Sequence, residues 1–254
     1  KCCPKCGAHH KLTCKERFET FFDNKEFELI ETPLPKDDPV SFEDKKKYLD
    51  RLKTARKLTG QDDAVIIAKG KIKNVDAVVG AQDFRFIGGS FGAASGEAFI
   101  AGAQNAIENQ QPLLVITSGG GMKMQESMIS LSQMPRTTLA INELKKNNLP
   151  YIVLLTDPTA GGITASYAML GDIHMAEPGA LIAFAGARVI QGTVREELPP
   201  GFQRSEYLEK SGFVDMIVER KDIREKLGML LSILLKKNSV IKTVENETTE
   251  SNTA

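Results

Sequence analysis

The sequence predicts an α/β fold in which helices connect the strands of one sheet, with a small appendage at the amino end. Two observations support this prediction. Short apolar runs typical of strands alternate with helix-like stretches between residues 64 and 235, and two of these runs lead into a Gly-Gly pair. Such alternation is typical of domains with crossover helices. The chain has 254 residues, which is long enough for one large domain with its own core.

The first quarter of the chain divides into two segments that precede the main domain. Residues 1–15 are basic and rich in Cys and His, and residues 16–60 are charged and helix-like, with prolines at 33–39 marking a break. Apolar stripes with helical spacing run through Phe18, Phe21 and Phe22, and later through Tyr48, Leu49, Leu52, Ala55 and Leu58. We expect the main domain to cover residues 61–237 and the polar residues 238–254 to form a disordered tail.

The main domain starts with two strand-like runs, 64–68 and 75–79, whose short connection predicts a hairpin. A glycine-rich segment then leads into a helix over 93–107. Further strands are expected over 173–176 and 180–184, and an amphipathic helix over 223–235. The repeated order is therefore strand, glycine-rich loop, helix.

The two Gly-Gly pairs are the most informative feature. Gly120-Gly121 follows the apolar run 112–117, Gly161-Gly162 follows the run 150–155, and each precedes a helix-like stretch. Because glycine lacks a Cβ, a substrate carbonyl can approach the peptide N–H groups closely. A helix N-terminus adds unpaired N–H groups and a partial positive charge. Each junction therefore predicts an oxyanion site, and the alternative is a pair of ordinary tight turns.

Helical spacing also marks the segment between the two pairs. Met124, Met128, Leu131 and Met134 recur on one helix face, and Pro135 should end or kink that helix. Leu139, Ile141 and Leu144 mark a second helix ahead of the strand that begins at Tyr151.

Composition excludes several function classes. Hydrophobic residues make up 41% of the chain and charged residues 26%, which is ordinary for a globular protein. The 33 basic residues balance 33 acidic ones, and a net charge of zero argues against nucleic acid as a partner. No run reaches the roughly 18 apolar residues of a membrane helix, and no secretory signal opens the chain.

All four cysteines lie within the first 14 residues, which indicates metal binding in a reducing compartment rather than a disulfide framework. Cys3 and Cys6 have the spacing of zinc ligands, but one such pair supplies only half of a tetrahedral site. The candidates for the other half within this segment are Cys2, Cys14, His9 and His10.

Seven segments in one order carry a resemblance to a known family. They are Cys3-Pro-Lys-Cys6 with His9-His10; 86–92; Gly120-Gly121 with 124–126; 154–162; 168–172; 184–186; and 199–206 ahead of 212–218. From Cys3 to about Leu235, the chain resembles the β subunit of bacterial and plastid-type acetyl-CoA carboxylase carboxyltransferase. The resemblance implies a crotonase-like (ClpP/crotonase) fold, a spiral of ββα units, with a zinc-ribbon remnant at the amino end.

The resemblance also implies a reaction and partners. The carboxyl group would move from carboxybiotin to acetyl-CoA, giving malonyl-CoA in the first committed step of fatty acid synthesis. Enzymes of the family work with a separate α subunit in an α2β2 heterotetramer, with biotin carboxylase and with the biotin carboxyl carrier protein that supplies the biotin. They act in the cytoplasm.

The resemblance assigns roles to the glycine pairs. Both halves of the reaction place negative charge on an oxygen, so they need hydrogen-bond donors rather than a side-chain nucleophile. Gly120 and Gly121 would hold the thioester enolate oxygen, and Gly161 and Gly162 form a second candidate pair. Gly88 and Gly89 either make a packing turn or line the CoA channel. His174, in a strand-like run, is expected to be a packed or surface residue rather than a base.

Basic residues near these segments are candidates for the CoA phosphates, which basic side chains usually bind. They are Lys123, Arg188, Arg195 and Arg204, and each is equally compatible with a solvated surface charge. The glycine loops lack the spacings of a P-loop and of a dinucleotide-binding fingerprint. ATP hydrolysis is therefore expected to belong to a partner.

The resemblance also bears on the metal site and on competing functions. The family carries a second C-x-x-C pair upstream, and because the chain opens on Lys we expect that pair to be lost by truncation, with Cys2 and Cys14 as bystanders. One alternative function is a carboxyltransferase or decarboxylase subunit for another acyl-CoA. Another is a zinc-ribbon module that binds nucleic acid. The ribbon cysteines together with the segment 203–206 favour acetyl-CoA.

Overall fold

The computed structural model describes residues 1–236 apart from Cys6, Ala8 and 195–197. The tail predicted over 238–254 lies outside the described residues. A mixed sheet runs through the molecule in the order β1-β2-β3-β4-β5-β6-β8, with β7 paired to β5. Its strands are β1 (Phe27–Leu29), β2 (Val65–Ile72), β3 (Val75–Gln82), β4 (Leu113–Gly119), β5 (Tyr151–Ala160), β6 (Ile173–Ala176), β7 (Ile182–Ala183) and β8 (Met216–Ile217). From β3 to β8 neighbouring strands are parallel, whereas β1-β2-β3 is antiparallel.

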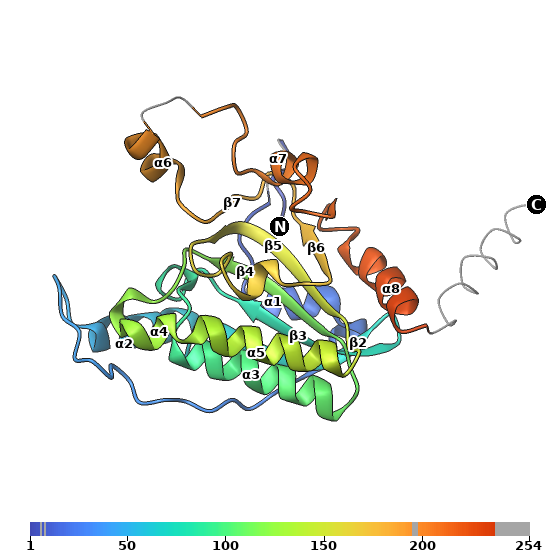
Figure 1. The fold of residues 1–254 in the computed structure, drawn as a ribbon. Coiled ribbons are helices and arrows are strands. Elements are labelled where there is room, and N and C mark those ends of the chain that lie inside the picture. Colours follow the sequence, from blue (N-terminus) through green and yellow to red (C-terminus); the bar gives the residue numbers. More distant parts are fainter. Residues whose placement is uncertain (6, 8, 195–197, 237–254) are drawn as a thin grey trace, which may run out of the picture.

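Helices cover both faces of this sheet (Figure 1). On one face lie α3 (Ala93–Glu108) and α5 (Gln133–Lys146), and on the other lie α1 (Cys14–Phe21) and α8 (Ile223–Leu234). Strand β5 shows why its apolar run is continuous, because Tyr151 and Val153 enter the first core while Ile152 and Leu154 enter the second. The predicted α/β architecture is confirmed. None of the helices in the described part of the chain is long and apolar enough to cross a membrane.

Most elements of the main domain agree with the sequence pattern. The hairpin is β2–β3, the 93–107 helix is α3, and the 223–235 helix is α8. The two short strands expected between 173 and 184 are β6 and β7. Three further elements were not foreseen: α6 (Ala187–Val194), α7 (Ser205–Lys210) and β8.

The segment 16–60 is less helical than its pattern suggests. It contains α1, the 3-10 turn η1 (Asp23–Lys25), strand β1 and α2 (Tyr48–Thr59). Thr13 and Glu16 form a capping box that starts α1. Strand β1 pairs with β2, a long-range contact that local spacing cannot reveal. In α2 only Tyr48, Leu52 and Ala55 of the expected stripe are buried.

The prediction of one continuous helix from the methionine spacing is wrong. The segment forms a 3-10 turn, η3 (Met124–Glu126), and a single turn, α4 (Met128–Leu131), before α5. Pro135 lies in the first turn of α5, where a missing N–H costs no helical hydrogen bond, so it neither ends nor kinks the helix there. The side chains of Met124 and Met128 are exposed.

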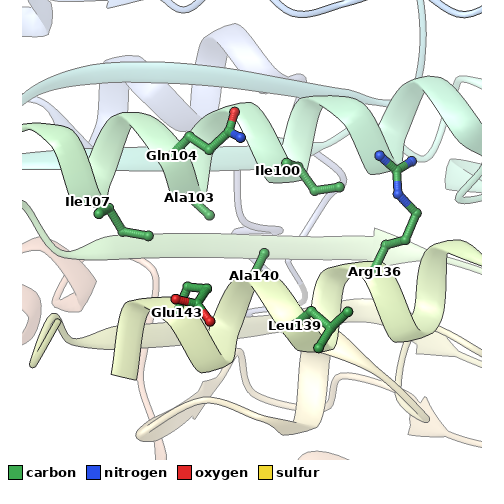
Figure 2. A pocket seen from close by; sticks show the side chains of 8 residues that line it. All are labelled: Ile100, Ala103, Gln104, Ile107, Arg136, Leu139, Ala140 and Glu143. Atoms are coloured by element: carbon green, nitrogen blue, oxygen red, sulfur yellow. The ribbon is translucent and has the colours of Figure 1, made fainter. Parts of the chain in front are cut away.

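Helices α3 and α5 pack side by side and leave a shallow groove of about 300 Å³ between them (Figure 2). Its walls include Ile100 and Ile107 from α3 and Leu139 and Ala140 from α5. None of its lining residues belongs to a glycine pair. The groove is therefore a feature of the helical layer and not of the glycine loops.

A buried ionic cluster holds the amino-terminal segment against the sheet. Glu177, which directly follows β6, receives hydrogen bonds from Arg17 and from both Nε (3.0 Å) and Nη2 (2.7 Å) of Arg220. Arg220 also donates to the carbonyls of Lys1 (3.0 Å) and His10 (2.9 Å). Burial alone would raise the pKa of Glu177, but the two guanidinium groups outweigh burial and lower it to about 2. Glu177 is therefore a carboxylate at neutral pH, locked between two cations.

Candidate active site

Three glycine pairs meet at one edge of the sheet. Gly88-Gly89 lies beyond the end of β3, Gly120-Gly121 follows β4, and Gly161-Gly162 follows β5. Since these strands are parallel, their carboxyl ends lie at the same edge. The contacts are close: a Cβ at Gly161 would lie 3.2 Å from the Gly121 Cα, and a Cβ at Gly121 would lie 3.9 Å from the Gly162 nitrogen.

Only one N–H of the first pair is available. Gly120 N–H donates to the Gly88 carbonyl at 3.0 Å, so it is committed within the protein. Gly121 has φ +140°, a conformation that favours glycine, and its carbonyl accepts from Phe91 N–H at 2.9 Å. Within the part of the chain that the structure describes, the Gly121 N–H donates no hydrogen bond. Gly121 is therefore the candidate donor of this pair.

The second pair divides in the same way. Gly161 N–H donates to the carbonyls of Ala183 (3.0 Å) and Phe184 (3.1 Å), which fastens the loop to β7. Among the described residues, the Gly162 N–H donates no hydrogen bond. Each pair thus offers one N–H, and the two loops that carry them are in contact.

The helix-dipole part of the sequence argument is not supported by the structure. Gly121 is followed by an irregular stretch and η3, and Gly162 is followed by turns before the 3-10 turn η4 (Tyr167–Met169). Neither unpaired N–H therefore belongs to the first turn of an α-helix. The donors are loop amides, whose direction depends on the contacts that hold the loops.

Gly88 and Gly89 lie in the 3-10 turn η2 (Ile87–Gly89), next to the loop that follows β4. A Cβ at Gly89 would clash with the Ser118 carbonyl oxygen, and the Gly88 carbonyl accepts from Gly120 N–H.

Gln82, at the end of β3, was missed by sequence reasoning. Its amide donates to the Gly89 carbonyl (2.5 Å) and accepts from Ser118 N–H (3.0 Å) and from the Tyr167 hydroxyl (3.1 Å). The signal available in the sequence was a polar residue at the end of an apolar, strand-like run.

An apolar recess of about 650 Å³ adjoins the second glycine pair. Thr164 and Ala165 form its wall next to the loop, and Phe184 and Phe213 form part of the rest. Gln203 also lines it, and its Oε1 is buried without a hydrogen-bond partner. The recess gives the Gly161-Gly162 loop an apolar side.

The basic candidates have different environments. The ammonium of Lys123 has no exposed surface and contacts the carboxylates of Asp63 and Glu126 (3.5 Å), so it is not available to a phosphate. Arg204 is half-exposed and donates to the Gly179 carbonyl (2.9 Å) and to Asp157 (3.4 Å). The backbone of Arg188 lies in α6, while its side chain and all of Arg195 lie outside the described residues.

His174 lies away from the glycine loops. It is in β6, near the amino end of a parallel strand, and its Nε2 accepts from Gly171 N–H at 3.1 Å. Burial lowers its pKa, which favours the neutral imidazole. This position fits the expected packed strand residue.

Comparison with known proteins decides the family. Residues 28–239 match the carboxyl transferase domain family. The chain is 67% identical over 252 residues to the acetyl-coenzyme A carboxylase carboxyl transferase subunit beta of Pelagibacter ubique, covering 99% of this chain and 82% of that protein. The chain belongs to the family of acetyl-coenzyme A carboxylase carboxyl transferase β subunits. The β subunit of Caulobacter vibrioides (strain NA1000 / CB15N) is 58% identical over 229 residues, which are 90% of this chain and 75% of that one.

Solved structures confirm the crotonase-like carboxyltransferase fold expected for this β subunit family. Transcarboxylase 12S with hydrolysed methylmalonyl-coenzyme A bound has a TM-score of 0.72 at 22% identity, over 87% of this chain and 41% of that chain. The Pseudomonas malonate decarboxylase MdcD-MdcE hetero-dimer has a TM-score of 0.67 at 20% identity, over 87% and 86%. At these identities the likeness concerns the fold alone.

The zinc-ribbon remnant expected of a β subunit is not seen among the described residues, where no group of three or more His, Cys, Asp or Glu side chains could hold a metal. Cys6 lies outside them. Cys14 is not a substitute ligand, because it is buried, its thiol contacts the Ala81 carbonyl (3.2 Å), and burial raises its pKa to about 12. His9 is engaged by Glu177 (3.4 Å) and Glu219 (3.2 Å). Within the described residues, Cys2, Cys14, His9 and His10 therefore form no cluster that could hold a metal.

Proposed function

We propose that this chain transfers a carboxyl group from carboxybiotin to acetyl-CoA, giving malonyl-CoA. The observation that carries the proposal is the pair of unpaired loop amides, Gly121 and Gly162, on adjoining loops at the carboxyl edge of the sheet. Both halves of the transfer develop negative charge on an oxygen, and preorganised N–H donors stabilise such charge without a side-chain nucleophile. The biotin supplies the activated carboxyl group.

We assign the thioester enolate oxygen to the Gly121 N–H. The N–H of the neighbouring Gly120 donates to the Gly88 carbonyl, and the Gly121 carbonyl accepts from Phe91 N–H. These bonds hold the donor in place before the substrate binds. Gly162 is the second donor, next to the apolar recess, and Arg204 at the same edge is the half-exposed cation proposed for a CoA phosphate. Arg188 remains a candidate from the sequence.

The partners follow from the same proposal. A single chain offers two amide donors at this edge, and we propose that a carboxyltransferase α subunit completes the site in an α2β2 assembly. Biotin carboxyl carrier protein and biotin carboxylase would supply the carboxylated biotin, in the cytoplasm.

The reverse reaction tests this function. Malonyl-CoA and biocytin are incubated with this chain, with an α subunit, and with both, and acetyl-CoA release is followed. We expect release only in the mixture, because each subunit alone lacks part of the site. Absence of release in a mixture that forms a complex by gel filtration would contradict the proposed acyl substrate. Conversion of methylmalonyl-CoA to propionyl-CoA by a mixture that does not act on malonyl-CoA would identify another.

We also propose that Cys3 and Cys6 supply two thiolates to a structural zinc ion whose other ligands lie outside the described residues. Zinc content is measured by atomic emission on the assembled enzyme. We expect Cys3→Ser to lose most of the zinc and Cys14→Ser to keep it, because Cys14 is buried in the core. Equal zinc content in both variants would show that Cys3 is not a ligand.

A further inference from the structure

A fully buried lysine lies directly behind the first glycine pair. Lys123 has no exposed surface, and its ammonium contacts the carboxylates of Asp63 and Glu126. Burying a charge is costly unless it is paired and hydrogen-bonded, so such a residue needs a reason to be there. The reason is not phosphate binding, since no ligand can reach the ammonium.

Each carboxylate of this cluster is itself held in place. Asp63 accepts from the Ser95 hydroxyl (2.5 Å) and from Ala64 N–H (2.7 Å). Glu126 accepts from the Tyr48 hydroxyl (2.7 Å) and from Ala93 N–H (2.6 Å). Burial, with the Glu126 carboxylate beside it, raises the pKa of Tyr48 well above its usual range, so the phenol keeps its proton and donates.

The cluster therefore joins four parts of the chain that are far apart in sequence. Tyr48 opens α2, Asp63 precedes β2, Ala93 and Ser95 open α3, and Glu126 ends η3. Even the backbone is shaped for it, because a Cβ at Gly92 would lie only 2.5 Å from the Glu126 carboxylate. Asp37 and Arg56, which pair with each other, lie on its outer side beside Tyr48 and Asp63.

The main chain connects this cluster to the amide donor. Lys123 N–H donates to the Phe91 carbonyl at 2.8 Å, and Phe91 N–H donates to the Gly121 carbonyl at 2.9 Å. The first bond fixes the plane of the Met122–Lys123 peptide, and the second fixes the plane of the Gly121–Met122 peptide. On the other side, the bond from Gly120 to Gly88 fixes the Gly119–Gly120 peptide. The peptide that carries the unpaired Gly121 N–H lies between the fixed Gly119–Gly120 and Gly121–Met122 peptides.

We infer that Lys123 is a positioning residue for the reaction, which aims the Gly121 N–H through its ion pairs with Asp63 and Glu126. This inference rests on the proposed function of the Gly121 amide. It also explains why a lysine, rather than an apolar residue, is buried here: two carboxylates that face one cation define a single position for the loop. A small displacement of a catalytic donor is enough to lower the rate strongly.

The test compares Lys123→Met, which replaces the lysine with an unbranched apolar side chain that lacks the ammonium, with the double variant Lys123→Met/Asp63→Asn, which keeps the summed charge of the cluster. Both are assayed for the reverse reaction with the α subunit. We expect kcat per folded molecule to fall about tenfold or more in both, with KM for malonyl-CoA within about twofold. Lys71→Met is the matched control, because Lys71 forms a half-exposed ion pair with Asp76 in the β2–β3 hairpin.

Comparing the rate with the stability separates positioning from a purely structural role. Wild-type kcat in folded variants, with only the melting temperature lowered, would overturn the inference. If the Lys123 variants do not fold, Tyr48→Phe decides, with kcat lowered about threefold expected and an unchanged kcat contradicting the inference.

Hydrogen exchange at the bonded amides of Gly120 and Lys123, on either side of Gly121, gives a readout that does not depend on activity. We expect exchange over residues 119–123 to quicken in Lys123→Met and to stay unchanged in Lys71→Met. An inactive wild-type mixture together with faster exchange would sink the proposed function while leaving the positioning intact. Unchanged exchange in a folded Lys123→Met would sink the positioning itself.

Discussion

Gly121→Val should reduce carboxyl transfer by about a hundredfold or more while the protein still folds. Loss of one oxyanion donor typically costs 10²–10³ in rate. At φ +140° a valine is strained, so the backbone must turn, and the N–H that we assign to the enolate oxygen turns with it. The space itself is not the obstacle, since a Cβ at Gly121 would meet its nearest neighbour at 3.7 Å. The measurement is the reverse reaction with the α subunit, beside circular dichroism and melting temperature.

Gly212→Val is the matched control for this variant. Gly212 also has a positive φ, +78°, but it lies in the turn after α7 and a Cβ there would meet nothing within 4 Å. We expect the strain to lower the melting temperature of both variants. The rate of carboxyl transfer should fall only in Gly121→Val. A folded, fully active Gly121→Val would remove Gly121 from the mechanism.

Glu177→Gln should destabilise the protein by about 3–5 kcal/mol at neutral pH, because it leaves Arg17 and Arg220 buried without their shared anion. Urea unfolding at pH 7 gives the free energy of unfolding. Asp76→Asn is the control, since its ion pair with Lys71 is half-exposed and pairs of that kind contribute at most about 1 kcal/mol. Equal losses in the two variants would show that the buried cluster contributes no more than a surface pair.

The same variant has a defined pH dependence. The pKa of Glu177 is lowered from 4.5 to about 2 in the folded protein. A lowered folded-state pKa contributes stability that is present above the unfolded value and is lost as pH falls through the folded one. The wild-type protein should therefore lose this contribution between about pH 4.5 and 2, and the gap between it and Glu177→Gln should narrow over that window. A gap that stays constant down to pH 2 would contradict the role of the ionised carboxylate.

The fold could be predicted from the sequence where buried positions leave a regular pattern of apolar or small residues. Strands β4 and β5 are apolar on both faces, and α3 carries small residues on the face that meets the sheet, so composition alone marks them. Strand β1, with only three residues, exists because β2 pairs with it. Helices α6 and α7 have only eight and six residues, too few to stand out from a sequence pattern.

The candidate site was predictable as to place but not as to geometry. Glycine marks where the chain must turn closely, and the two pairs at the ends of parallel strands do meet. Which N–H is free depends on carbonyls from distant segments, such as Gly88 for Gly120 and Ala183 for Gly161. In the sequence Lys123 is compatible with a surface charge, because no neighbouring residue indicates that it is buried. Its partner Asp63 lies 60 residues away in the chain.

The division of labour within each glycine pair has a practical consequence for anyone mapping this enzyme by mutagenesis. One amide in each pair fastens the loop, the other donates no hydrogen bond within the described part of the chain, and neither belongs to a side chain. An alanine scan of the polar residues would register supports such as Gln82 and the proposed phosphate ligand Arg204, and would leave the two amide donors unmarked. The groups that we assign to the chemistry can be removed singly only by replacing an amide bond with an ester.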